Sequence, residues 1–78
     1  MMFHEIQPGK HINLTSINYF FLSDDEMYRN SILIYFQGKK DFISIDFNDS
    51  WSCEQAYDKL VAKIYFMNNP SHINTIMD

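Results

Sequence analysis

The sequence predicts a single α+β domain over residues 1–78: a three- to four-stranded antiparallel sheet, arranged as a meander, with one C-terminal amphipathic helix packed on one face. Two observations predict this class. The chain has 78 residues, of which 46% are hydrophobic and 17% aromatic, which suits one small and dense core. Short β-like segments fill the chain up to Phe47, and the apolar residues then change to a helical period.

The first part of the chain predicts one short strand and one bent strand. Residues 3–7 form the short strand, and Pro8-Gly9 is a turn signal after it. Residues 12–22 are β-like except at Thr15-Ser16, where we expect a bend or tight turn between two short strands. The acidic residues Asp24-Asp25-Glu26 follow in a loop and must stay solvated, because unpaired charges are costly to bury.

The two clearest strands are residues 31–36 and 41–47, which we expect to form a hairpin. If Gly38-Lys39 are the two central residues of a type II′ turn, glycine takes the first central position, as that turn requires. Ile34 then pairs with Ile43, and apolar residues meet apolar residues on both faces of the hairpin.

A helix is predicted over residues 50–67. Asn48-Asp49-Ser50 supplies N-cap candidates, and Asn68-Asn69-Pro70 supplies a stop signal. Residues 70–78 have some helical spacing but are too few to hold a helix alone, so their conformation stays open. The apolar stripe of the helix consists of Cys53, Ala56, Tyr57, Leu60, Val61 and Ile64.

One helix covers only one face of the sheet, so the second face raises the question of function. The face toward the helix is expected to carry Ile32, Ile34, Phe36, Ile43, Ile45 and Phe47. The second face carries Leu33, Tyr35 and Phe42, with either Phe20 and Leu22 or Tyr19 and Phe21. Aromatic residues inside a polar rim are typical of protein-binding surfaces. Three possibilities remain for what covers this second face: the chain's own termini, a second copy of the chain, or a foreign partner.

The charge of the chain favours a protein partner with a basic surface. The chain has ten acidic residues and six scattered Lys and Arg residues, which gives a net charge of −4. Duplex DNA binding normally needs a clustered basic face, and the sequence has none. An acidic protein attracts a basic partner over long range. Tyr65 and Phe66 leave the helix stripe and are either a second contact or packed beneath the tail. The candidate partner-binding residues are Asp24, Asp25, Glu26, Leu33, Tyr35, Phe42, Asp46, Tyr65 and Phe66.

The sequence gives no sign of an enzyme, a metal site or a cofactor. Cys53 is the single cysteine, and its place on the helix stripe predicts a small buried hydrophobe. The histidines (His4, His11 and His72) show no zinc-binding spacing. The N-terminus does not resemble a signal peptide, and no apolar run is long enough for a membrane span. We therefore expect a location in the cytoplasm of a bacterium or of an infected host cell.

The segments 12–19, 32–36, 43–47 and 56–60 together resemble small uncharacterised bacterial and phage proteins in which a β-meander is closed by one helix. In size, acidity and lack of catalytic residues, the chain is also similar to phage-encoded inhibitors of bacterial defence, including anti-CRISPR proteins. The resemblance implies a non-enzymatic protein-binding domain from a phage or mobile element that blocks a basic surface on a host protein. Two alternatives stay open: a small nucleic-acid-associated bacterial regulator that uses the sheet, and a homodimeric structural protein.

Overall fold

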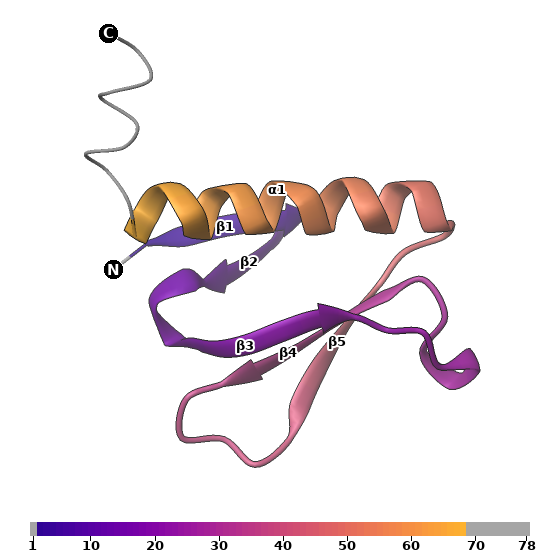
Figure 1. The fold of residues 1–78 in the computed structure, drawn as a ribbon, viewed down its shortest axis with the longest axis horizontal. Helices are drawn as coiled ribbons and strands as arrows, with labels where there is room; N and C mark the ends of the chain where they lie inside the picture. The colour runs from indigo at the N-terminus through magenta and orange to yellow at the C-terminus, as the bar shows by residue number, and fades with distance from the viewer. Residues whose placement is uncertain (1, 69–78) are drawn as a thin grey trace, which may run out of the picture.

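A computed structural model describes residues 2–68 and shows an α+β fold with antiparallel strands and one helix (Figure 1). The fold class predicted from the sequence is therefore confirmed. The predicted stop after the helix, the tail over residues 70–78, and His72 lie outside the described residues. The elements are β1 (Phe3–Gln7), β2 (Lys10–Asn13), η1 (Leu14–Ser16), β3 (Ile17–Leu22), η2 (Glu26–Tyr28), β4 (Ser31–Phe36), β5 (Phe42–Asp46) and α1 (Ser50–Asn68).

The strands form two sheets, because a tight turn interrupts the predicted bent strand. β1 pairs with β2, and β3, β4 and β5 form a separate meander. Between β2 and β3, the Asn13 side-chain oxygen accepts hydrogen bonds from the backbone N–H and the hydroxyl of Thr15. Asn side chains that bond to nearby backbone N–H groups offer the chain an alternative to the strand ladder. The bend expected at Thr15-Ser16 thus becomes the 3₁₀ turn η1, which separates the sheets.

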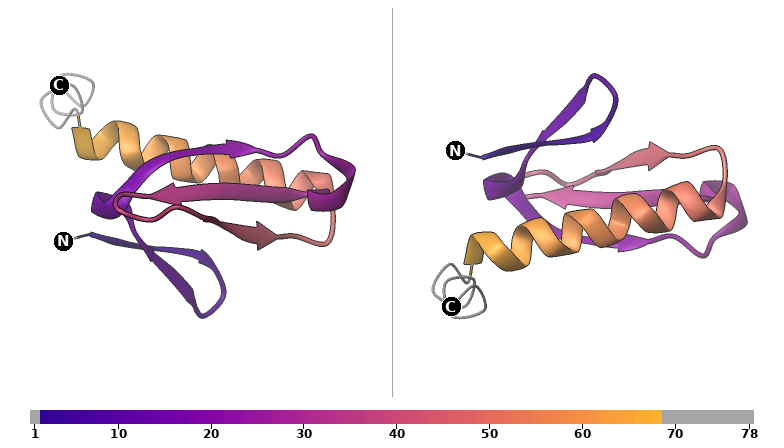
Figure 2. Two further views of the ribbon diagram at one scale, coloured as in Figure 1. Left: turned by 90° about the horizontal axis from the view of Figure 1, so that it is seen from below. Right: turned by 90° about the horizontal axis from the view of Figure 1, so that it is seen from above.

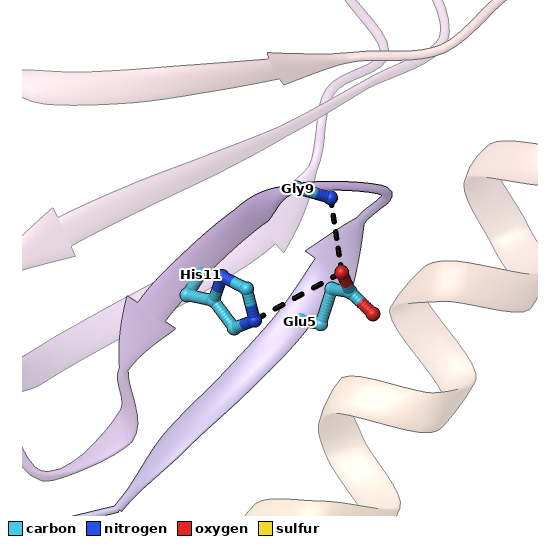
Figure 3. A network of polar contacts seen from close by, with 3 residues as sticks. All are labelled: Glu5, Gly9 and His11. Atoms are coloured by element: carbon cyan, nitrogen blue, oxygen red, sulfur yellow. Dashed lines mark hydrogen bonds and ion pairs between the residues drawn. The ribbon is translucent and has the colours of Figure 1, made fainter.

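The β1–β2 hairpin closes through the predicted turn. Gln7 pairs with Lys10, so Pro8 and Gly9 are the central residues, and Gly9 has a φ of +77°. Proline followed by glycine at positive φ is typical of a type II turn. A Glu5 carboxylate oxygen accepts a hydrogen bond from the Gly9 N–H at 2.9 Å and lies 3.9 Å from His11 Nε2 (Figure 3). The Glu5 side chain therefore ties the turn to strand β1.

The register predicted for the β4–β5 hairpin is confirmed, and its turn differs. Ile34 pairs with Ile43, as expected. The Lys39 N–H donates to the Phe36 carbonyl, which makes Gln37 and Gly38 the central residues of the turn. Gly38 takes the second central position with a φ of +79°, so the predicted type II′ turn, with glycine first, is wrong. The connection is longer than a two-residue turn, and it keeps the same strand register.

Helix α1 begins where the sequence offers a cap. The Asp49 carboxylate accepts a hydrogen bond from the Ser52 N–H at 2.7 Å, which makes Asp49 the N-cap residue. Cys53 and Leu60 of the predicted stripe are buried. Val61 is 41% exposed, so it lies at the border of the stripe rather than within it.

The core lies between the β3–β4–β5 sheet, α1 and the β1–β2 hairpin (Figure 2). Ile32 and Ile34 of the central strand are fully buried, whereas Ile43, expected to meet the helix, is exposed on the edge strand. The N-terminal hairpin contributes to this same core and does not lie on the second sheet face. The buried members of the core are Ile6, Ile12, Leu14, Ile32, Ile34, Ile45, Cys53 and Leu60.

Candidate protein-docking face

One face of the β3–β4–β5 sheet is covered by neither α1 nor the β1–β2 hairpin. The view from below in Figure 2 shows the three strands in front of the helix, with the hairpin beside them. We call this surface the open face. Its residues within the described part of the chain are Tyr19 and Phe21 from β3, Leu33 and Tyr35 from β4, Phe42 and Ser44 from β5, and Tyr28 from η2.

Strand register decides which residues of β3 belong to the open face. Tyr19 pairs with Tyr35 and Phe21 pairs with Leu33, whereas Phe20 pairs with Ile34 on the core side. The Phe20 ring contacts the Tyr57 ring of the helix, with centroids 5.6 Å apart. Of the two sets left open by the sequence, Tyr19 and Phe21 therefore occupy the second face.

The rings of the open face form one connected group. Tyr19 stacks on Tyr35 with centroids 4.4 Å apart, and Phe21 lies 6.3 Å from both rings. Phe42 lies 5.5 Å from Tyr35, and Tyr28 meets Phe42 edge-on at 5.3 Å. Burial raises the pKa of the Tyr35 phenol, and the neighbouring Tyr19 raises it further. Contacts of this kind hold the rings in fixed positions, which lowers the entropic cost of binding another surface.

Accessibility separates the members of this group. Tyr19 is 50% exposed and Phe21 is 40% exposed, so both offer contact area. Leu33, expected among the contacts, is only 6% exposed because it sits in the central strand. Leu33 therefore supports the rings from within and presents little surface to a partner.

A polar cluster lies at the end of the open face where β4 begins. The Asp46 carboxylate accepts hydrogen bonds from the hydroxyls of Ser31 and Ser44. The hydrogen bond from Ser31, and to a smaller extent that from Ser44, holds the pKa of Asp46 below its ordinary value. The residue therefore keeps its negative charge. Gln7 donates from its side-chain amide to the Asp46 carbonyl, which ties the N-terminal hairpin to β5.

The acidic loop, residues 23–30, borders the same end. Asp25 caps the short turn η2 by accepting a hydrogen bond from the Met27 N–H, and its own N–H donates to Ser23 Oγ. Asp24, Asp25 and Glu26 are exposed. Tyr28 of this loop reaches the open face through its contact with Phe42. The acidic loop therefore adjoins the open face through Tyr28.

Tyr65 and Phe66 belong to a different part of the molecule. Both are exposed on α1, on the side of the sheet away from the open face, and their rings meet edge-on at 5.9 Å. Phe66 borders a shallow apolar hollow with His4, Lys59, Ala62 and Lys63. These two aromatic residues cannot share one flat contact with the open face.

A groove of about 440 Å³ lies between β1 and the first half of α1, with His4, Trp51 and Lys59 in its lining. Burial lowers the pKa of His4, and Lys63 and Lys59 lower it further, so the neutral imidazole is favoured.

Among residues 2–68, no three metal-binding side chains lie close enough to share an ion. Burial also raises the pKa of the Cys53 thiol. Helix α1 has no apolar stretch long enough to cross a bilayer.

The sequence did not indicate that Tyr28 belongs to the open face. It offered Tyr19 and Phe21 only as one of two alternatives for β3. The alternation of β3 gave two equal choices, and a loop tyrosine carries no periodic signal.

Comparisons with models of protein families, with curated proteins and with solved structures found no match.

Proposed function

We propose that the chain is a non-enzymatic protein-binding domain whose open face docks a protein surface carrying apolar and basic groups. The observation that supports it best is the connected group of rings on a sheet face that neither α1 nor the β1–β2 hairpin covers. Tyrosine and phenylalanine supply large contact area with few rotatable bonds, which is why aromatic residues recur at the centres of interfaces.

The acidic loop adds attraction at longer range. Asp24, Asp25 and Glu26 are exposed beside the rings, and Asp46 is kept ionised at the same end of the sheet. Complementary charge speeds encounter and fixes orientation, whereas the buried aromatic contacts hold the complex once formed. This division of roles suits a partner with basic groups around an apolar patch.

Where such a surface belongs to a nucleic-acid-binding protein, the carboxylates of the acidic loop compete with phosphates for the same basic groups. A domain of this kind acts as an inhibitor, in keeping with the resemblance to phage-encoded inhibitors of bacterial defence. The proposed place of action is the cytoplasm of a bacterium or of an infected host cell.

Capture from a bacterial lysate with matched variants tests the proposal. The immobilised wild type and a Trp51→Ser control, altered on the far side of the sheet, should retain the same protein. Phe42→Asp should abolish retention, because a charge replaces the ring that contacts both Tyr28 and Tyr35 in the open face. Asp24→Asn with Glu26→Gln should weaken retention and its dependence on salt; Asp25 is kept because it caps η2.

Two results would overturn the proposal. In the first, no protein, including the chain itself, binds in a way that Phe42→Asp removes. In the second, single-stranded nucleic acid binds the open face and Lys40→Ala removes that binding, which would favour base stacking on the rings instead.

A further inference from the structure

We infer that the open face binds a second copy of this chain, in a two-fold arrangement that sets the acidic loop of each copy against residues 37–41 of the other. We call residues 37–41, which join β4 to β5, the basic turn. The inference rests on the proposed function, because it names the partner of that same face. The observation that carries it is the opposite charge at the two ends of the face.

The charges are separated along the strands. β3 runs into the acidic loop, β4 runs back from it, and the basic turn follows β4, so the two segments lie at opposite ends of the sheet (Figure 1). The acidic loop has a net charge of −2, including Arg29, and the basic turn has a net charge of +1, including Asp41. A six-residue strand lies between them, a span of about 17 Å at the usual rise per residue.

That span keeps the two ends from neutralising each other within one chain. Charges in solvent are screened beyond about 8 Å at physiological ionic strength. Within residues 2–68, the side chains of Asp24, Glu26, Lys39 and Lys40 form no hydrogen bond or ion pair. All four are exposed, so their charges are available to another molecule.

A two-fold axis that lies between the faces and crosses the strands brings opposite charges together. The acidic loop of one copy then meets the basic turn of the other, and the same contact occurs twice, as in any isologous dimer. An axis along the strands would instead place loop against loop and turn against turn, which like charges oppose. Sheets that pack face to face keep their strands within about 30° of each other, which this arrangement allows.

The apolar residues fit the same arrangement. The exposed rings of Tyr19 and Phe21 lie on β3, which runs between the charged ends, and would be buried between the two copies. Met27, 80% exposed at the acidic loop, would face the basic turn, where the hydrocarbon stems of Lys39 and Lys40 can cover it. Burial of these side chains explains why a water-facing sheet surface carries them.

A charge-swap experiment tests the arrangement on the full chain. The loop variant is Asp24→Lys with Glu26→Lys, and it leaves the capping residue Asp25 in place. The turn variant is Lys39→Glu with Lys40→Glu. Sedimentation equilibrium up to about 1 mM protein covers weak as well as tight association. The wild type should approach twice the chain mass of 9.3 kDa, and each variant alone should associate at least about tenfold more weakly.

Mixing the two variants gives the decisive result. In the mixed dimer, the lysines of the altered loop face the glutamates of the altered turn, and the unaltered ends also attract each other. The mixture should therefore associate to within about threefold of the wild type, although neither variant does so alone. Lys59→Glu with Lys63→Glu on α1 makes a similar change of charge away from the face and should leave association unchanged.

Three results would overturn the inference. The mixture could fail to recover association, or the wild type could stay monomeric while Phe42→Asp still removes binding of another protein. The second result would leave the proposed function standing with a foreign partner. A monomer that binds no protein, and that Phe42→Asp unfolds, would point to cover by residues 69–78 of the same chain and would end both proposals.

Discussion

The Tyr19 and Tyr35 rings stack across neighbouring strands of the open face, with centroids 4.4 Å apart and ring planes 14° from parallel. The two residues are directly paired in the β3–β4 ladder. A cross-strand pair of this kind links the edge strand to the central strand through side chains as well as through the backbone.

Tyr19→Ala should lower the free energy of unfolding by about 1 kcal/mol, because it removes an aromatic pair from the sheet. Chemical denaturation followed by far-UV circular dichroism measures the change. Trp51→Ala is the control: Trp51 is exposed on α1 and forms no ring pair within residues 2–68, so its loss should cost less than about 0.5 kcal/mol. Equal losses in the two variants would contradict a stabilising role for the stack.

Leu60→Ala should destabilise the protein far more than Val61→Ala, although the residues are neighbours on α1. Leu60 is fully buried in the core, and truncation of such a residue costs about 2–5 kcal/mol. Val61 lies at the exposed border of the stripe, so its truncation should cost less than about 1 kcal/mol. Thermal unfolding of both variants checks the difference. Similar losses would mean that both side chains are buried to the same extent.

Cys53 should resist alkylation until the protein unfolds. Only 2% of its surface is exposed. Burial raises the pKa of its thiol, and the nearby Glu54 carboxylate raises it further. Since the thiolate is the reactive form, iodoacetamide should modify native protein at least about tenfold more slowly than protein in concentrated urea. Mass spectrometry of samples quenched over time measures both rates, and equal rates would place the thiol at the surface.

Acid should weaken the fold through Asp46. Its hydrogen bonds from Ser31 and Ser44 lower the pKa in the folded state below the ordinary value of 3.8. The folded state therefore binds the proton less readily than the unfolded state, and this contribution to stability is present above pH 3.8 and is lost as pH falls through the folded-state pKa.

Urea unfolding between about pH 5 and pH 2 measures the contribution of Asp46. Asp46→Asn should remove it, so that stability falls less steeply with acid than in the wild type. Ser44→Ala should remove only the part that its hydroxyl supplies, because the Ser31 hydrogen bond remains. A wild-type slope in Asp46→Asn would show that other groups carry the dependence.

Local pattern predicted the elements well where apolar residues leave one consistent choice. In the β4–β5 hairpin, pairing Ile34 with Ile43 places apolar residues together on both faces, and a slip of one residue would separate them. The longer turn around Gly38 does not disturb this register. The helix stripe was predicted for the same reason, apart from its border at Val61.

The composition of the open face could not be predicted fully because of a β-bulge. The register between β3 and β4 shifts between Ile17 and Tyr19, and one extra residue exchanges the two faces of everything that follows. Nothing in the alternation of residues 17–22 reveals this shift. The contact of Tyr28 with Phe42 depends on the path of an irregular loop, and the placement of the N-terminal hairpin depends on tertiary packing.

Within residues 2–68, each strand pairs only with a neighbour in chain order: β1 with β2, β3 with β4, and β4 with β5. Both hairpins and the meander therefore close short loops, which costs little chain entropy and is typical of rapidly folding domains. Helix α1, which packs against β1, β3 and β4 from the far end of the described chain, forms the contacts of greatest sequence separation. We expect its docking to be the slow step, after the strands have already assembled.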